Sequence, residues 1–205
     1  MEHSITDWKR EGKKILEPLI KLFVWLNLSP NVFTFLGLIL SFIAAYFYYK
    51  YKFWAGGVVL LVMGFFDIVD GEVARRKGKE TKFGALFDST SDRIAEYIIF
   101  AVFLWIFRSK LWWFIVVMLS LIGSQLVSYL RARGEGLGVS ERSGIFDRTG
   151  RFLYLIFLSF ICSVIGYRYF VYFLVPYMVG TWGTVVQRFL KLKQKFKKEG
   201  GKYHG

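Results

Sequence analysis

Four aspartates gather in one stretch of the sequence, between residues 67 and 92. Asp67 and Asp70 lie three residues apart, so on a helix they share one face. Asp88 and Asp92 lie four residues apart and do the same. The short segment between the two pairs predicts antiparallel, neighbouring helices, so all four carboxylates can converge at one end of them. Carboxylate oxygens suit Mg²⁺ or Mn²⁺, and two such ions could bridge a diphosphate.

The surrounding sequence is apolar, and this makes the cluster costly. An ionised Asp in a membrane span costs about 2.5–3.5 kcal/mol on insertion scales, before mutual repulsion. Asp67 and Asp70 also fall near a helix C-terminus, where the helix dipole disfavours anions. Positive charge must compensate, either from a structural ion-pair network with Arg75, Arg76 and Arg93 or from divalent metal. We favour metal, because the four acids exceed what these arginines could pair while remaining free for other work.

Two glycines accompany the aspartates. Gly71 directly follows Asp70, and Gly84 lies four residues before Asp88. Without side chains they allow close approach of a nucleotide or, alternatively, of a neighbouring helix. Arg75, one turn beyond Gly71, could hold a phosphate with two parallel hydrogen bonds.

The elements that must position these residues are membrane helices. The 205 residues are 55% hydrophobic and 20% aromatic, although the net charge is +13, which indicates apolar spans separated by basic loops. Backbone groups in lipid must be paired internally, so the sequence predicts an all-α polytopic fold with six transmembrane helices. The six apolar stretches are 32–49, 53–74, 84–107, 111–130, 152–167 and 169–189.

The flanking segments differ from these spans. Apolar residues at helical spacing within 5–27, with lysines between them, predict an N-terminal interfacial amphipathic helix. We therefore divide the chain into a cytoplasmic interfacial helix (1–27), a six-helix membrane domain (28–190) and a basic cytoplasmic tail (191–205).

Charge distribution predicts the orientation. Of the 28 Lys and Arg residues, 22 lie on the side that carries both termini, which is the positive-inside pattern of a cytoplasmic-membrane protein. Nucleic-acid binding requires no such alternation, so we exclude nucleic acid as a partner. A cation transporter or a structural scaffold are the non-enzymatic alternatives. A transporter predicts acids spread across the bilayer, whereas these gather at one end.

The spacing D-x2-D-G-x2-A-R-x8-G-x3-D-x3-D resembles the signature of the CDP-alcohol phosphatidyltransferase family. Its fixed positions here are Asp67, Asp70, Gly71, Ala74, Arg75, Gly84, Asp88 and Asp92. The resemblance includes residues 29–34 ahead of the first span, and the six-span plan extends it over nearly the whole chain.

The resemblance implies a homodimeric enzyme that transfers a lipid phosphate from a CDP-linked lipid to a small alcohol, with release of CMP. It implies that two Mg²⁺ or Mn²⁺ ions are held by Asp67, Asp70, Asp88 and Asp92. Asp92 would also be the general base that accepts the proton of the acceptor hydroxyl. The implied contacts to the CDP-lipid are Asn31, Thr34, Gly71, Ala74, Arg75, Thr81 and Gly84.

Five arginines in the cytoplasmic segments could form a pocket for a phosphorylated acceptor. They are Arg131, Arg133, Arg148, Arg151 and Arg188. The alternative is that they are ordinary positive-inside loop charges. The local pattern resembles the family branch that makes phosphatidylinositol phosphate, or its archaeal ether-lipid counterpart, from inositol phosphate. Glycerol phosphate is the alternative acceptor, and the donor is either a phosphatidyl or an archaetidyl lipid.

Overall fold

The computed structural model of the chain describes residues 17, 18, 21, 24, 29–78, 81–141, 143, 144 and 146–198. For Pro30 and Asp70 it describes the backbone alone. Within these ranges the chain is helical and has no strand, which confirms the predicted all-α fold.

Each of the six apolar stretches overlaps one long helix. The helices are α2 (Pro30–Tyr49), α3 (Phe53–Lys77), α4 (Lys82–Ile106), α5 (Leu111–Gly136), α6 (Arg148–Ile165) and α7 (Phe170–Lys198), with a short 3₁₀ turn, η1 (Tyr167–Tyr169), before α7. Five of them, all except α4, are long and apolar enough to cross a membrane. α4 carries Asp88, Asp92, Arg93 and Glu96 in its first fifteen residues, which lowers its apolar character. The sixth span therefore stays a prediction.

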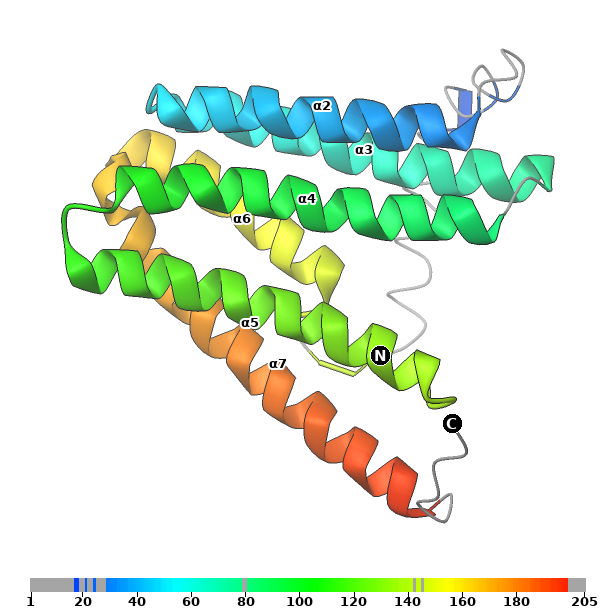
Figure 1. Ribbon diagram of the computed structural model, residues 1–205. Helices are drawn as coiled ribbons and strands as arrows, with labels where there is room; N and C mark the ends of the chain where they lie inside the picture. Colours follow the sequence, from blue (N-terminus) through cyan, green and yellow to red (C-terminus); the bar gives the residue numbers. More distant parts are fainter. Residues whose placement is uncertain are drawn as a thin grey trace.

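The helices form two groups, one of α2, α3 and α4 and the other of α5 and α7 (Figure 1). α2 packs against both α3 and α4, α5 packs along α7, and α6 packs against α3. α3 and α4 were predicted to be direct neighbours, but in the described part of the chain α2 provides the main contacts of both. The axes of α2, α3 and α4 run nearly parallel to one another (Figure 1).

Aromatic side chains pack the helices together at one end. We call this the aromatic end: Tyr48, Phe53, Phe103, Phe107 and Phe170, all buried. The ring centroids of Phe103 and Phe170 are 4.5 Å apart, and those of Tyr48 and Phe103 are 4.9 Å apart. These rings come from the end of α2, the start of α3, the end of α4 and the start of α7, so they join four helices at the same level.

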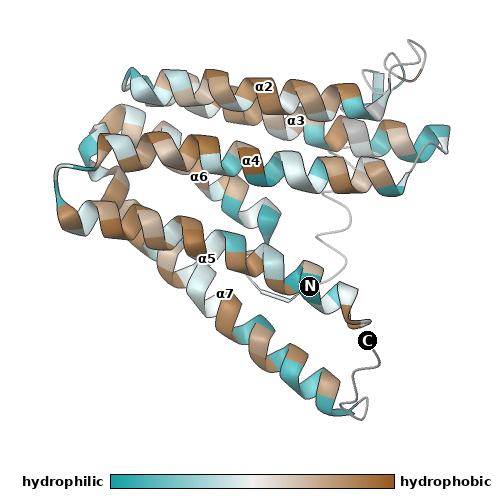
Figure 2. Cartoon of the chain, in the orientation of Figure 1, coloured by the Kyte–Doolittle hydropathy of each residue, from teal (hydrophilic) through white to brown (hydrophobic). Residues whose placement is uncertain are grey.

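The predicted domain boundaries are only partly covered by the structure. Most of the predicted interfacial helix lies outside the described residues. At the other terminus α7 continues through Lys198, so residues 191–198 of the predicted basic tail are helical. Figure 2 shows hydrophobic residues along the helices, with hydrophilic residues gathered toward the C-terminal half of α7 and the C-terminal end of α3. The polar ends of these helices lie opposite the aromatic end.

Candidate active site

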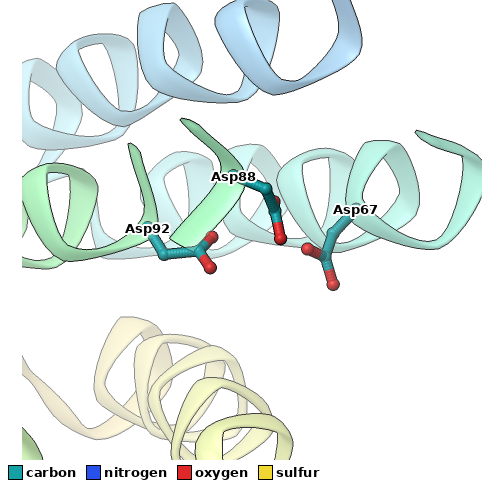
Figure 3. A group of neighbouring side chains, drawn as sticks. All are labelled: Asp67, Asp88 and Asp92. Atoms are coloured by element: carbon teal, nitrogen blue, oxygen red, sulfur yellow. The ribbon is translucent and has the colours of Figure 1, made fainter. Parts of the chain in front are cut away.

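Three of the four predicted aspartates converge in space. Asp67 of α3 and Asp88 and Asp92 of α4 each offer a carboxylate oxygen, and these oxygens lie within 4.8 Å of one another (Figure 3). Asp67 is exposed, whereas Asp88 and Asp92 are half-buried. The backbone of Asp70 lies one turn beyond Asp67 on α3, but its side chain is outside the described part of the chain. We call the three described carboxylates the acidic cluster.

The ends of α3 and α4 determine where these carboxylates lie. α3 ends at Gly78, which adopts a left-handed conformation with φ of 58°, a backbone geometry that glycine adopts at no steric cost. α4 begins after Thr81, whose hydroxyl accepts a hydrogen bond from the Gly84 amide at 2.9 Å. This N-cap satisfies one of the free amides of the first turn. α3 ends and α4 begins near each other in the sequence, and the aspartates of both helices lie at the same end.

Arg148 lies directly on the acidic cluster. Its Nη2 donates to Asp67 Oδ1 at 2.8 Å and also to Asp92 Oδ1. Arg148 is the first residue of α6, and its position is set by the N-cap Asp147, whose carboxylate accepts from the Gly150 amide at 2.8 Å. A residue predicted to bind the acceptor thus forms a bridge between two predicted metal ligands.

The local arginines, which were the alternative counter-ions of the aspartates, meet other partners among the described residues. Arg75 pairs with Glu72 at 2.6 Å, and Arg76 pairs with Glu17 at 2.6 Å. Arg93 hydrogen-bonds Ser128 and lies 3.9 Å from a Glu96 oxygen. The salt bridges to the acidic cluster, within the described residues, come from Arg148 instead.

The composition of the cluster fits a hard divalent cation. The ligand atoms are carboxylate oxygens, which Mg²⁺ and Mn²⁺ prefer. Asp92 Oδ2 is buried and has no hydrogen-bond partner, although buried polar atoms are nearly always paired. Three carboxylates against the one guanidinium of Arg148 also leave negative charge to be balanced. An additional cation would supply both the missing partner and the missing charge.

A cavity of about 440 Å³ opens beside the cluster. It is lined by residues of α2, α3, α4 and α6, with Asp67, Asp88, Asp92 and Arg148 in its polar part. The rest of its wall is largely apolar and includes Phe33, Leu38, Leu60, Ile99, Phe100 and Ile156. Such a cavity suits an amphiphile whose charged group meets the carboxylates while its apolar part lies among the helices.

The residues predicted to contact a CDP-lipid lie near the polar ends of α2, α3 and α4. A Cβ added at Gly84 would lie 3.0 Å from Thr81 Oγ1 and 3.4 Å from Asn31 Oδ1, so these three residues form a tight group. Thr34, one turn after Asn31, is buried and lines the cavity. On α3, Gly71, Ala74 and Arg75 fall within the last two turns, and Arg75 is exposed.

The five arginines predicted for an acceptor fall into three environments. Arg151 and Arg188 are each 3% exposed. Arg151 donates to the Phe146 carbonyl at 2.9 Å and to Ser128 Oγ at 3.0 Å, and its buried Nε has no partner. Arg188 donates from Nε and Nη1 to the carbonyls of Ser143 and Val127 at 2.8 and 2.7 Å.

The other members of this set are more exposed. Arg131 pairs with Glu135 at 3.1 Å. It lies close enough to Arg188 for their charges to interact, as does Arg151. Arg133 is exposed at the end of α5. Arg148 does not pair with this group but forms salt bridges to Asp67 and Asp92 of the acidic cluster.

Sequence reasoning missed a polar network next to the site. Glu96 accepts hydrogen bonds from Ser124 and from Gln125 Nε2, the latter at 2.9 Å. Ser128 accepts from both Arg93 and Arg151 and so joins α4, α5 and α6. One signal could have revealed it. Glu96 continues the four-residue spacing of Asp88 and Asp92 along one face of α4.

The comparisons with known proteins agree with this geometry. Residues 27–189 match the sequence model of the CDP-alcohol phosphatidyltransferase family. The chain is 34% identical to the archaetidylinositol phosphate synthase of Pyrococcus horikoshii over 185 residues, which cover 89% of this chain and 93% of that protein.

Solved structures agree in fold. The crystal structure of Mycobacterium tuberculosis phosphatidylinositol phosphate synthase with CDP-DAG bound gives a TM-score of 0.79 at 27% identity, covering 87% of this chain and 94% of that one. The same enzyme in complex with manganese and citrate gives a TM-score of 0.77 at 27% identity, covering 85% and 87%. The chain belongs to the CDP-alcohol phosphatidyltransferase family and is a membrane enzyme of phospholipid synthesis.

Proposed function

We propose that this enzyme transfers the phosphatidyl or archaetidyl group of a CDP-linked lipid to a hydroxyl of inositol phosphate and releases CMP. The observation that carries this proposal is the acidic cluster, which opens onto a cavity with a polar part and an apolar wall. The names of the relatives support inositol phosphate as the acceptor, and the CDP-DAG complex supports the donor.

The donor would lie along this cavity. Its CDP group would meet Asn31, Thr81 and Gly84 at the start of α4 and Gly71, Ala74 and Arg75 at the end of α3, while Thr34 lines the wall between them. A small residue at 84 permits close approach of the nucleotide, because the backbone there has no Cβ to exclude it. The apolar wall would hold the first part of the lipid chain.

The metal ligands would be Asp67, Asp70, Asp88 and Asp92, with Mg²⁺ or Mn²⁺ as the ions. When bound, such ions neutralise the diphosphate and stabilise the charge on the departing CMP. The manganese complex of the M. tuberculosis enzyme supports a divalent cation in this fold. Two ions, as in other phosphoryl-transfer sites, would match the number of carboxylates.

The reaction forms one bond and breaks one at the same phosphorus. The acceptor hydroxyl oxygen bonds to the phosphorus that carries the lipid, the bond between that phosphorus and the CMP oxygen breaks, and CMP leaves with the electron pair. The hydroxyl proton passes to Asp92, whose Oδ2 is buried and unpartnered while Oδ1 is held by Arg148. Asp92 is thus available for proton transfer through Oδ2.

The acceptor phosphate would be bound by the arginines beside the cluster. Arg151 offers its unpartnered Nε, and Arg188 is held rigidly next to it by two backbone carbonyls. Arg131, Arg133 and Arg148 complete this proposed set. A phosphate gains from such a group because planar guanidinium donors match its oxygens in pairs.

A panel of acceptors tests the substrate assignment. The full-length protein would be given CDP-diacylglycerol or its archaeal ether analogue together with inositol phosphate, glycerol phosphate, free inositol or serine. We expect CMP release and a new lipid product with inositol phosphate. A product formed only with glycerol phosphate would contradict this acceptor, and release that persists in excess chelator would contradict metal dependence.

The orientation and assembly also belong to this proposal. The positive-inside pattern supports an active site and both termini on the cytoplasmic face, and the family resemblance supports a homodimer. Labelling of single cysteines placed at position 137 or 110, in intact and in opened cells, would distinguish the two faces. Position 137 should react only after opening.

A further inference from the structure

Arg148 occupies the side of the acidic cluster that a metal ion would need. A single nitrogen, Nη2, donates to Oδ1 of both Asp67 and Asp92, which come from different helices. Oxygen ligands of Mg²⁺ lie about 2.0–2.1 Å from the ion, and in well-formed sites the ion lies between them. An ion shared by these two oxygens and the Nη2 group would occupy the same space, and both carry positive charge.

We propose that Arg148 is the counter-ion of the metal-free site, that metal displaces it, and that the displaced guanidinium then binds the phosphate of the incoming anionic substrate. The inference rests on the metal-binding part of the proposed function and assigns to Arg148 two successive partners. Metal binding and substrate binding are coupled through this side chain.

The metal-free cluster needs such a counter-ion. Three carboxylates held close together repel one another, and a half-buried acid is poorly screened by water. Among the described residues, Arg148 is the arginine that forms salt bridges to the cluster, whereas Arg75, Arg76 and Arg93 lie against carboxylates outside it. Arg148 comes from α6 and so also ties that helix to α3 and α4.

The released guanidinium has a defined destination. Arg148 lines the same cavity as Asp88 and Asp92, and Arg151 lies one turn further along α6. The helix start is held by the Asp147 cap and by the Arg151 amide, which donates to the Asp147 carbonyl at 3.0 Å. The backbone can therefore stay in place while the long Arg148 side chain turns from the carboxylates toward a phosphate beside Arg151.

Metal affinity is the direct test, because removal of Arg148 should strengthen metal binding rather than weaken it. Mn²⁺ binding to the full-length protein would be followed by the loss of the free-ion paramagnetic resonance signal, without donor or acceptor. Because its competitor is gone, Arg148→Gln should bind Mn²⁺ about tenfold more tightly than the wild type, a coupling of ordinary size. Arg76→Gln, which removes the same charge from a neighbouring site that is paired with Glu17, should change the affinity less than about twofold.

The second readout is the coupling itself. Adding Mn²⁺ should tighten inositol phosphate binding to the wild type by about tenfold and to Arg148→Gln by clearly less, because the variant has no guanidinium to release. Arg148→Lys keeps the charge but loses the planar fork, so its Mn²⁺ affinity should lie between the other two.

The outcomes separate this inference from the proposed function. If the wild type binds no Mn²⁺, the proposed function fails. If the wild type binds Mn²⁺ and Arg148→Gln binds it equally or more weakly, only the role of Arg148 is overturned. Should Arg148→Gln unfold without metal, refolding on addition of Mn²⁺ supports the role. If Arg148→Gln stays unfolded, Arg148→Lys provides the test. The role is overturned if Arg148→Lys binds Mn²⁺ no more tightly than the wild type does.

Discussion

The two ends of the helix bundle differ in the side chains that meet there and in how their polar groups are paired. At the aromatic end five buried rings from four helices meet, and the hydroxyl of Tyr48 is paired with Ser159 Oγ at 2.6 Å. At the other end, the acidic cluster holds three carboxylates, and one of its oxygens, Asp92 Oδ2, is left unpaired. At the aromatic end the rings pack against one another and the buried hydroxyl is paired, whereas the acidic end retains charge repulsion and an unpaired oxygen.

This difference explains how the site is tolerated. Close packing of aromatic side chains stabilises the helix arrangement through burial and ring contacts. A buried carboxylate oxygen without a partner and the mutual repulsion of the acids have the opposite effect. The aromatic end can maintain the positions of α2, α3, α4 and α7 while the acidic end remains open to ions and substrate. Substitutions at the aromatic end should therefore lower stability, whereas substitutions at the acidic end should lower activity or substrate binding.

The largest effect is expected at the acidic end. Asp92→Asn should lower the turnover number by about 100-fold or more, because the proton acceptor is lost. Binding of the CDP-lipid should remain within a few fold, since the amide has nearly the same shape. CMP release and donor binding would be measured on the same preparation. Turnover like that of the wild type would remove Asp92 from the role of base.

The next effect is expected at the aromatic end, and on stability. Phe103 is 1% exposed and its ring contacts Tyr48, Phe53, Phe100 and Phe170. Phe103→Ala should lower the free energy of unfolding by about 3 kcal/mol through lost burial and the cavity left behind.

Thermal unfolding in detergent would measure this loss, and Michaelis constants of the folded fraction should be unchanged. Phe83→Ala is the matched control, because Phe83 lies on the same helix but is 66% exposed. If both variants lose the same stability, the aromatic end has no special role.

A pair of glycine substitutions compares the two ends directly. A Cβ at Gly56 would lie 2.6 Å from ring atoms of Tyr48, so Gly56→Ala should destabilise the protein by about 1–3 kcal/mol through overpacking. Among the described residues, a Cβ at Gly84 meets Thr81 at 3.0 Å and Asn31 at 3.4 Å.

Gly84→Ala should therefore keep the unfolding temperature but raise the KM for the CDP-lipid about tenfold, a loss of about 1.4 kcal/mol of binding. Unfolding curves and donor titrations of both variants would be recorded in parallel. The comparison breaks down if Gly84→Ala unfolds early while its donor KM is normal.

The smallest effect concerns the loop between α5 and α6. Lys195 donates to Glu141 at 2.8 Å and to the Ser140 carbonyl at 2.7 Å. The hydrogen bond from Lys195, followed by that from Ser143, lowers the pKa of Glu141 from 4.5 to about 2. Because the folded pKa is depressed, the stabilisation is complete above pH 4.5 and is lost as the pH falls toward 2.

Glu141→Gln should accordingly lower stability by about 1 kcal/mol or less at pH 7, with the difference from the wild type shrinking between pH 4.5 and 2. Chemical unfolding at several pH values would measure it. Glu135→Gln is the control, because Glu135 is 40% exposed in its pair with Arg131. A difference that grows on acidification would contradict the ion pair.

Much of the site was predictable because it depends on local spacing. The spacing of Asp67, Asp88 and Asp92 along two predicted helices was enough to predict that their carboxylates converge. The acidic cluster confirms this convergence. Gly78 caps the end of α3 and Thr81 caps the start of α4, where the sequence predicted that one helix ends and the next begins. The predicted roles of these residues stay predictions, as do the contacts of the acceptor arginines.

The partners of the cluster were not predictable in the same way. Arg148 is 81 residues from Asp67 and 56 from Asp92, and no periodicity relates residues across intervening helices. Arg75, Arg76 and Arg93 were the expected counter-ions because they lie close to the aspartates in the sequence. Among the described residues their side chains pair elsewhere: Arg75 and Arg93 meet acids three residues away on their own helices, and Arg76 meets Glu17.

By itself the sequence determined that this chain forms apolar helices, that its acids lie at one end and that their spacing is that of a phosphotransfer family. These properties follow from hydropathy and helical period, which are local. The tertiary structure decided which cation meets the acids, which oxygen remains unpaired and where the cavity lies. Those depend on how distant helices pack, and packing is decided by the fit of side chains across the whole bundle.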